Sequence, residues 1–230
     1  HGTSRGLGDV YKRQDQIETG LKEAAAQPNI EAQTSLEIMD RFSSGAPQGL
    51  KEAPAGSDRP LRFIDAISEG LKVSMEKHPE LVLMGQDIGP YGGVFKVTDG
   101  FVDAFGEERV RNTPLCESAI VGAGLGLSIA GKKAMVEMQF SDFVTCGFNQ
   151  IVNNLAKIHW RWGQSADVVV RMPTGGGVGA GPFHSQSTEA WFFHVPGLKI
   201  AYPSTPADAK GLLRMAIDDP NPVLFFEHKN

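Results

Sequence analysis

The chain has 230 residues, of which 41% are hydrophobic and 21% are charged, with a formal net charge of −5 at pH 7. This length allows one sizeable core with extra segments, and the mildly acidic balance argues against nucleic acid and anionic membranes as partners. The sequence has no apolar run of about eighteen residues and no apolar signal-peptide core at its start, so we expect no membrane span. Two cysteines are too few for a disulfide framework, and we expect a cytoplasmic protein.

The first part of the chain is expected to lie outside the main domain. Residues 1–14 look like a translated sequencing adapter, so we interpret them as an adapter or assembly scar. Apolar residues at helical spacing predict a short helix over residues 15–25. Residues 26–60 have the Ala-, Pro-, Gly- and Ser-rich composition of a linker, with a short helix expected at residues 36–42.

From Leu61 onward, strand patterns alternate with helix patterns. The strand runs are uniformly apolar, which is typical of a mostly parallel sheet covered by helices on both faces. The expected fold class is therefore α/β. The expected strands cover residues 81–84, 133–138, 167–171, 198–202 and 222–227, and the expected helices cover residues 63–75, 101–105, 142–160 and 206–217, with another that begins at residue 117.

A glutamate at the start of a glycine-rich helix is the first candidate for chemistry. Pro114 ends the preceding segment, and Glu117 opens a helix whose surface is left bare by Gly122, Gly124 and Gly126. Each glycine costs about 1 kcal/mol of helix stability relative to alanine, so three of them indicate close approach of another backbone or a flat ligand. A poorly solvated carboxyl group at this rim would favour sharing a proton with a ring nitrogen. The alternative is a first-turn residue that complements the helix dipole.

A glycine-rich loop over residues 173–188 is the second candidate. It ends in His184-Ser185-Gln186, which places a titratable ring beside polar neighbours. A long glycine-rich loop in a compact domain is usually functional or disordered, so a surface histidine in a flexible loop is the alternative. The other histidines have no metal-ligand spacing, which argues against a zinc site.

The segment Gln139-Phe140-Ser141-Asp142-Phe143 bridges a predicted strand and a predicted helix. Two aromatic side chains at the carboxyl end of a parallel strand are well placed to cover a flat ring. Core packing is the alternative, and we interpret Phe140 in that way. Asp142 is expected to be the N-cap of the following helix.

Several motifs together resemble one known family. They are Thr113-Pro-Leu-Cys-Glu117, the Gly122/Gly124/Gly126 helix, Glu137-Met-Gln-Phe-Ser-Asp142, His184-Ser-Gln186 and Pro196-Gly-Leu-Lys199, in the family's order and spacing. The family is the β subunit of the thiamine diphosphate-dependent decarboxylating component of 2-oxo acid dehydrogenase complexes. The resemblance covers residues 59–230, as a transketolase-like pyrimidine-binding domain. It points to the branched-chain (2-oxoisovalerate) type through Pro114-Leu-Cys-Glu117 and Phe225-Phe-Glu227.

The resemblance implies roles for individual residues. Glu117 matches the glutamate that hydrogen-bonds the aminopyrimidine ring and activates the cofactor for attack on the 2-oxo carbonyl. Phe143 matches an aromatic residue packed on the pyrimidine, and Leu115 lies beside the same ring. His184 matches an active-site histidine near the substrate and the acyl-transfer path. A structural potassium site in the family matches Ala166, Val168, Ala216, Asp219 and Asn221.

Other parts of the family pattern are missing from the sequence. In the family, diphosphate and magnesium are held by an α-type domain with a Gly-Asp-Gly motif, which this sequence lacks, and a carboxy-terminal domain would follow Asn230. Residues 15–58 resemble the tail of an α-type region plus a linker. We therefore expect a fragment, inactive by itself, of a fused α/β chain or of a separate β subunit. The resemblance implies an α-type partner domain, a homodimer or heterotetramer, and a lipoyl-bearing acyltransferase core.

The expected activity is oxidative decarboxylation of a branched-chain 2-oxo acid with acyl transfer to lipoamide. Three alternatives stay open at this point. They are a pyruvate dehydrogenase-type β subunit, another thiamine diphosphate enzyme such as a transketolase, and a non-catalytic α/β interaction domain in which the glycine helix packs against a partner.

Overall fold

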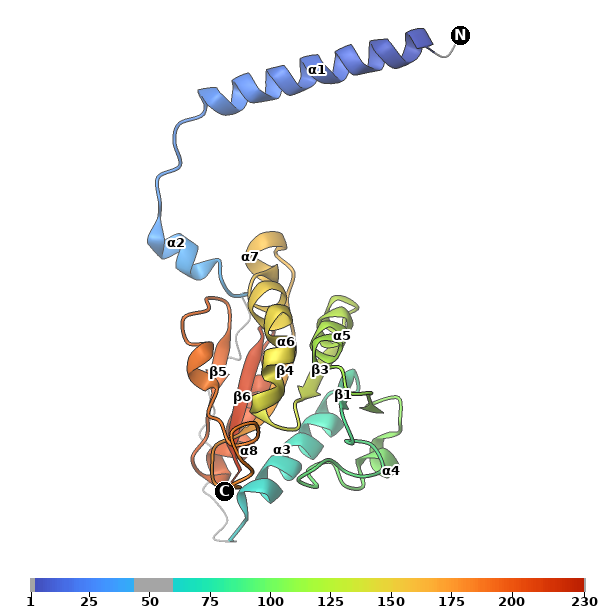
Figure 1. The fold of residues 1–230 in the computed structure, drawn as a ribbon, viewed down its shortest axis with the longest axis vertical. Helices are drawn as coiled ribbons and strands as arrows, with labels where there is room; N and C mark the ends of the chain where they lie inside the picture. The colour runs from blue at the N-terminus through green and yellow to red at the C-terminus, as the bar shows by residue number, and fades with distance from the viewer. Residues whose placement is uncertain (1–2, 44–59, 230) are drawn as a thin grey trace. The chain divides into compact units, whose positions relative to one another are not determined.

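The computed structural model describes residues 3–43 and 60–229, in two units that divide between residues 38 and 39. In the first unit, helix α1 (Thr3–Ala26) is exposed from Gly8 onward (Figure 1). It is longer than the predicted helix of residues 15–25 and begins within the segment interpreted as foreign. Part of the expected linker of residues 26–60, namely residues 44–59, lies outside the described residues. No helix in the described part has the length and apolar character needed to cross a membrane.

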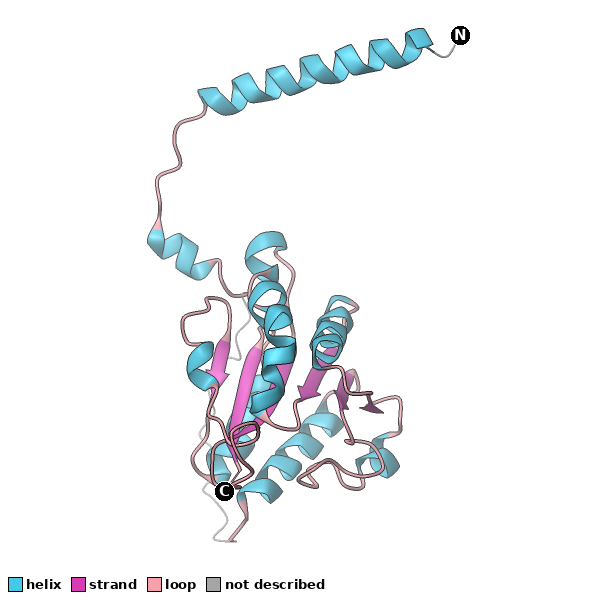
Figure 2. Cartoon of the chain, viewed as in Figure 1, coloured by secondary structure: helices cyan, strands magenta, loops and turns pink. Residues whose placement is uncertain are grey.

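The second unit is built on one six-stranded sheet in the order β2-β1-β3-β4-β6-β5, and every neighbouring pair of strands is parallel (Figure 2). All residues of β1 and β4 are buried, as expected for a sheet covered on both faces. The predicted α/β fold class is confirmed. The strands are β1 (Leu81–Gly85), β2 (Val110–Asn112), β3 (Lys133–Glu137), β4 (Val168–Thr174), β5 (Lys199–Ala201) and β6 (Val223–His228).

Helices cover the two faces of this sheet, and each face has its own buried cluster. Leu71 of α3 and Leu213 of α8 pack with alternate strand residues such as Met135 on one face. Ile120 of α5 and Val144 of α6 pack with the intervening residues on the other face. The helices of this unit are α3 (Phe63–Lys77), α4 (Phe101–Phe105), α5 (Glu117–Ile129), α6 (Val144–Asn149), α7 (Ile158–Trp162) and α8 (Pro206–Asp218), and α2 (Thr34–Met39) spans the division between the two units.

The single helix predicted for residues 142–160 is wrong, because the structure divides this segment. A 3₁₀ turn, η1 (Ser141–Phe143), leads into α6, which continues as a π-helical turn, η2 (Gln150–Leu155), before α7. Within α6, Gly147 lets the segment pack closely on α5, since a Cβ atom there would lie 3.4 Å from the main-chain oxygen of Glu117.

The carboxyl ends of the parallel strands lead into the segments with the predicted site residues. Gln86 follows β1, the 139–143 segment follows β3, and the glycine-rich loop follows β4. In open parallel sheets, ligands bind outside the carboxyl ends of the strands. The topology thus gathers Glu117, Phe143 and His184 at the edge of the sheet where a ligand site is expected.

Candidate functional site

Glu117 is the first residue of α5 and is only 7% exposed. Its Oε1 atom accepts a hydrogen bond of 3.3 Å from Nε2 of Gln86, which directly follows β1. No side chain in the described part of the chain donates a hydrogen bond to the other oxygen, Oε2. The carboxyl group therefore has one oxygen held by the protein and one left for another donor.

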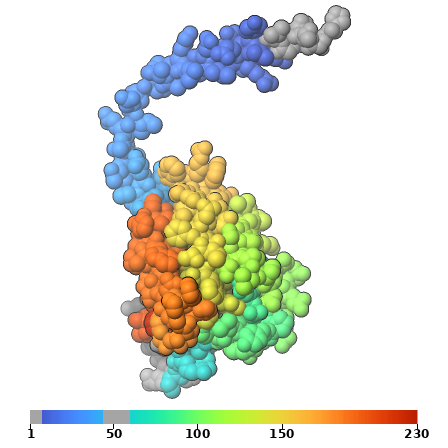
Figure 3. Space-filling view, in the orientation of Figure 1, coloured from blue at the N-terminus to red at the C-terminus, as the bar shows by residue number. Residues whose placement is uncertain are grey.

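An open groove runs along Glu117 on the face where α5, in yellow-green, lies beside α6, in yellow (Figure 3). Both thiols of the chain line it, with Cys116 half-buried and Cys146 exposed. A flat ring could therefore reach the glutamate from this side. The lining residues are Cys116, Glu117, Ser118, Ala119, Gly122, Cys146 and Gln150.

The three glycines of α5 face different neighbours. A Cβ atom on Gly124 would lie 2.9 Å from Cγ1 of Val136, so this glycine brings the helix close to the sheet. A Cβ atom on Gly122 would lie 3.5 Å from the Gln150 side chain in the groove, and one on Gly126 would meet nothing within 4 Å. Of these three glycines, only Gly124 shows a close approach, and the approaching group is a strand side chain, not the backbone or flat ligand that was predicted.

Phe143 and His184 lie in contact near the ends of β3 and β4. Their ring centroids are 5.3 Å apart and the rings are nearly perpendicular, at 88°. Phe140 adds a third ring, 5.4 Å from His184 and 5.7 Å from Phe143, and its other side meets Phe95 at 5.7 Å. The interpretation of Phe140 as a core residue is therefore wrong, because this half-buried ring supports the histidine. No described residue hydrogen-bonds the imidazole nitrogens of His184.

The end of the glycine-rich loop is tied to the sheet by hydrogen bonds. The main-chain oxygen of Gln186 accepts from the Gly175 amide at 2.9 Å and from the Thr174 hydroxyl at 3.2 Å. The main-chain amide of Gln186 donates to Oδ1 of Asp142 at 3.0 Å. Asp142 makes no helix-capping hydrogen bond, so its predicted role as an N-cap is wrong, and its carboxylate holds the loop instead.

Lys229 reaches the same loop from the end of β6. Its Nζ atom donates to the main-chain oxygen of His184 at 2.6 Å and lies 3.7 Å from Oδ2 of Asp142. The ammonium also sits 4.7 Å from the centre of the Phe140 ring. The sequence analysis did not select this residue, although the charged residues that end the apolar run of β6 are a usable signal for the carboxyl edge of a sheet.

A buried ion triad spans three neighbouring strands below this edge. Arg171 on β4 is fully buried and donates to Glu137 on β3 and, through Nε and Nη2, to both oxygens of Glu227 on β6. Burial raises the pKa of Glu137, Arg171 opposes this rise, and the charge of Glu227 adds to it. Burial alone would lower the pKa of Arg171, but the two carboxylates reverse this effect and raise it.

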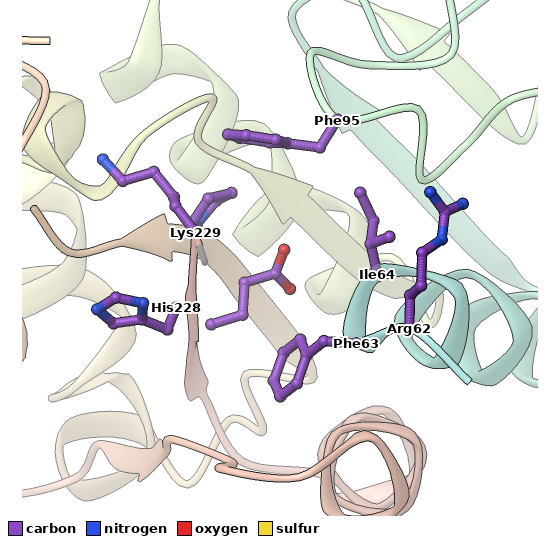
Figure 4. A pocket seen from close by; sticks show the side chains of 8 residues that line it. Arg62, Phe63, Ile64, Phe95, His228 and Lys229 are labelled. Carbon is purple, nitrogen blue, oxygen red and sulfur yellow. The ribbon is translucent and has the colours of Figure 1, made fainter. Parts of the chain in front are cut away.

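A pocket of about 220 Å³ lies between the first turn of α3 and the end of β6 (Figure 4). Phe95 and Lys229 line this pocket and also contact Phe140, so these two residues separate the pocket from the aromatic cluster around His184. The lining residues are Arg62, Phe63, Ile64, Phe95, Pro173, Glu227, His228 and Lys229.

Leu115, expected beside the cofactor ring, is 79% exposed two residues before Glu117. Its side chain is thus accessible to a ligand or a partner at the carboxyl edge. The five residues predicted to hold potassium are all buried, but at the opposite edge of the sheet, around the starts of β4 and β6 and the end of α8.

The side chains at the predicted potassium site already have partners. Oδ1 of Asp219 accepts from the amide and the Nδ2 of Asn221 at 3.0 and 2.8 Å, and Oδ2 accepts from Nζ of Lys199 at 2.5 Å. Oδ1 of Asn221 accepts from the Ser43 amide at 2.7 Å. The side-chain oxygens of Asp219 and Asn221 are thus held by donors of the protein, and the potassium site stays a prediction. The described residues contain no cluster of three His, Cys, Asp or Glu side chains that could hold a metal.

Comparison with known proteins gives matches at two levels. A family model described as "Transketolase, pyrimidine binding domain" matches residues 59–230. The chain also resembles a solved structure, "Split gene transketolase, inactive beta4 tetramer", with a TM-score of 0.59 and 21% identity over 74% of this chain and 52% of that one. At this level of identity, the similarity to the solved structure shows a shared fold and nothing more.

Two kinds of curated relatives are similar in sequence. The chain is 52% identical over 173 residues to the 2-oxoisovalerate dehydrogenase subunit beta of Bacillus subtilis (strain 168), which covers 74% of this chain and 52% of the relative. It is 42% identical over 185 residues to the pyruvate dehydrogenase E1 component subunit beta of Leifsonia xyli subsp. xyli (strain CTCB07), which covers 77% and 55%. The chain thus spans about half the length of the curated relatives it matches.

Proposed function

Because the chain belongs to the family of transketolase pyrimidine-binding domains, we propose that it forms the pyrimidine-binding half of a thiamine diphosphate-dependent 2-oxo acid dehydrogenase. The observation that carries this proposal is the Glu117 carboxyl group, nearly buried at a groove and held by a neutral amide at one oxygen only. When bound, thiamine diphosphate supplies the nucleophilic carbon and the electron sink that decarboxylation of a 2-oxo acid requires.

The residues of the chain have distinct roles in this proposal. Glu117 shares a proton with a ring nitrogen of the aminopyrimidine through Oε2, while Gln86 orients the carboxyl group through Oε1. Phe143 packs on the pyrimidine ring, and the exposed Leu115 adds an apolar contact. His184, whose ring nitrogens have no partner among the described residues, holds or transfers a proton near the substrate.

We further propose that the remaining components come from partners. An α-type domain supplies the groups that bind diphosphate and magnesium, in a homodimer or heterotetramer, and the acyl product passes to a lipoyl-bearing acyltransferase core in the cytoplasm. A structural potassium ion would be held by main-chain carbonyls at the end of α8 and the start of β4, since the side chains there are already engaged.

For the substrate, we favour a branched-chain 2-oxo acid. The support is the 52% identity to a relative named 2-oxoisovalerate dehydrogenase subunit, against 42% to one named for pyruvate. Pyruvate is the second candidate, because both kinds of name occur among the relatives.

The test is an assay of the full-length protein that contains this chain, together with its α-type domain or subunit, on 2-oxoisovalerate and pyruvate, each with and without thiamine diphosphate and Mg²⁺. Glu117→Gln should lower the cofactor-dependent turnover by about 10²–10⁴-fold without unfolding the chain, because it removes the proton-sharing carboxyl group. Glu108→Gln, at a side chain that is 89% exposed, is the matched control and should keep full turnover. Full activity of Glu117→Gln, or sugar-phosphate transfer in place of decarboxylation, would reject the proposal.

A further inference from the structure

Lys229 is buried in a way that is unusual for a lysine. Its side chain is 0% exposed, and in Figure 4 it directs its ammonium away from Phe63 and Ile64. Lysine side chains are almost never fully buried unless they are paired. Burial lowers the pKa of Lys229 while Asp142 opposes that effect, so the fold keeps a charge here at a cost in desolvation. The contacts of the buried ammonium indicate its role in the structure.

The ammonium and one carboxylate hold the two ends of the His184-Ser185-Gln186 segment. Lys229 donates to the main-chain oxygen of His184 at 2.6 Å, and Asp142 accepts from the amide of Gln186 at 3.0 Å. The free oxygen of Asp142, Oδ2, has no hydrogen-bond partner in the described part of the chain and lies 3.7 Å from the ammonium. This separation is too long for a hydrogen bond, so the two groups are joined as a buried ion pair.

The same ammonium contacts a ring that packs on the imidazole. Lys229 lies 4.7 Å from the centroid of Phe140, within the range of a cation–π interaction. Phe140 in turn meets the His184 ring edge to face at 5.4 Å, and Phe143 meets it from another side at 5.3 Å. Lys229 therefore holds the main chain of His184 directly, and it contacts Phe140, which packs on the His184 side chain.

The loop before the histidine needs such an anchor. Fixing a glycine costs more backbone entropy than fixing any other residue, and the loop approaches His184 through Gly175, Gly176, Gly177, Gly179 and Gly181. The part of the loop from Gly176 to Phe183 is largely exposed, so few packing contacts offset this entropy. A charge-assisted hydrogen bond directly at His184 is well suited to do so.

We propose that Lys229 is a positioning residue, whose ammonium, paired with Asp142, fixes His184 at the end of the glycine-rich loop. The consequence for catalysis rests on the role proposed above for His184. The anchoring itself is a property of this chain and is measurable without any activity.

The experiment compares amide hydrogen exchange over residues 176–187 in the 230-residue chain and its variants. Lys229→Met keeps the apolar stem but removes charge and donor, so exchange at His184 and Gln186 should rise at least tenfold. Lys229→Arg keeps the charge and the donor and should restore most of the protection.

Lys133→Met is the matched control. The Lys133 ammonium likewise donates to a carboxylate (Asp167) and to a main-chain oxygen (Ile217), but at the other edge of the sheet. The control should leave the loop unchanged.

Unchanged loop exchange in a folded Lys229→Met chain would overturn the proposal, as would a rise of equal size in Lys133→Met. If Lys229→Met does not fold, Asp142→Asn decides, because it removes the charge that pairs with Lys229 but retains an acceptor for Gln186. It should raise exchange at His184, and wild-type protection there would overturn the proposal. Turnover of the full-length protein with its α-type domain or subunit is a separate readout: absence of wild-type turnover would reject the proposed function, while the exchange data would still decide the anchoring.

Discussion

Glu117 and Glu137 are both nearly buried glutamates, and their partners determine what each can do. Glu117 is held by the neutral amide of Gln86 and has no charged partner among the described residues, so its second oxygen is left for a ligand. Glu137 is bound to the guanidinium of Arg171 within a buried triad. Its loss would leave the buried guanidinium of Arg171 without one of its two partners, which indicates a structural role.

The contact with Gln86 predicts a stability effect at the candidate site. Gln86→Met has nearly the same shape but removes the hydrogen bond to the buried carboxyl group of Glu117. We expect the free energy of unfolding to fall by about 1–3 kcal/mol, since a buried acceptor loses its donor. Gln139→Met, which removes an exposed hydrogen bond to Asp87, should change it by less than about 0.5 kcal/mol. Urea unfolding at pH 7 measures both values, and equal effects would contradict the expectation.

The raised pKa of Glu137 predicts a pH dependence. Burial raises the pKa of Glu137 and the charge of Glu227 adds to this rise, while Arg171 opposes it. Between the ordinary value of about 4.3 and the raised folded value, the native state keeps a proton that the unfolded state has lost. This contribution to stability is full below about pH 4.3 and is lost as the pH rises, by up to about 1.4 kcal/mol per pH unit.

Glu137→Gln removes this titration. The difference in free energy of unfolding between the variant and the wild-type chain should therefore shift in favour of the variant as the pH rises above about 4.3. Urea unfolding of both chains between pH 4 and pH 8 measures this difference, in which the titrations common to both chains cancel. A difference that stays constant over this range would contradict a raised pKa of Glu137.

Motifs in the sequence were sufficient to select Glu117, Phe143 and His184, because each lies in a short stretch of distinctive residue types. They were not sufficient to find Lys229, which is 45 residues from the histidine it contacts. Its role depends on two parallel strands that bring distant loops to one edge. The same applies to Asp142, where a local capping pattern competed with a tertiary contact to Gln186 and the tertiary contact prevailed.

At the scale of elements, α3 and α8 lie where the sequence predicts them, because one apolar face of each packs on the sheet and imposes helical spacing. Strand β2 was not predicted, since only Val110 of its three residues is buried and the strand has no apolar run. The division of the 142–160 segment was also missed. Its apolar spacing is compatible with one long helix, and the π-helical turn η2 leaves no signal in that spacing.

The glycines of α5 provide a matched pair of substitutions. Gly126→Ala adds a methyl group at an exposed helix position with nothing within 4 Å, so it should stabilise the chain by up to about 1 kcal/mol. Gly124→Ala places the methyl group 2.9 Å from Val136 on β3, so helix and sheet must separate, at a cost of about 1–3 kcal/mol. Thermal unfolding should show a higher Tm for the first variant and a lower Tm for the second. The same sign for both would mean that α5 does not pack on the sheet as described.

At the scale of the whole molecule, the carboxyl edge of the sheet brings together a carboxyl group, a cluster of aromatic rings and a histidine, which under the proposed function recognise an aminopyrimidine. The family of the domain could be predicted from the sequence because its motifs follow one another in order. The substrate could not, because the chain spans about half the length of relatives named for two different 2-oxo acids. Under the proposed function, the groups that bind the diphosphate come from the α-type partner.

This division of the cofactor site predicts how ligand binding affects stability. A ligand stabilises the folded state only to the extent that it binds there, by about 2.7 kcal/mol at a hundredfold excess over Kd. The chain alone contributes the pyrimidine contacts, so thiamine diphosphate with Mg²⁺ should shift its Tm by less than about 1 °C. With the α-type subunit present, the same ligands should raise the Tm by several degrees, and Glu117→Ala should reduce that rise because the ring loses its hydrogen-bond partner. A shift of several degrees in the chain alone would instead place a diphosphate site within these 230 residues.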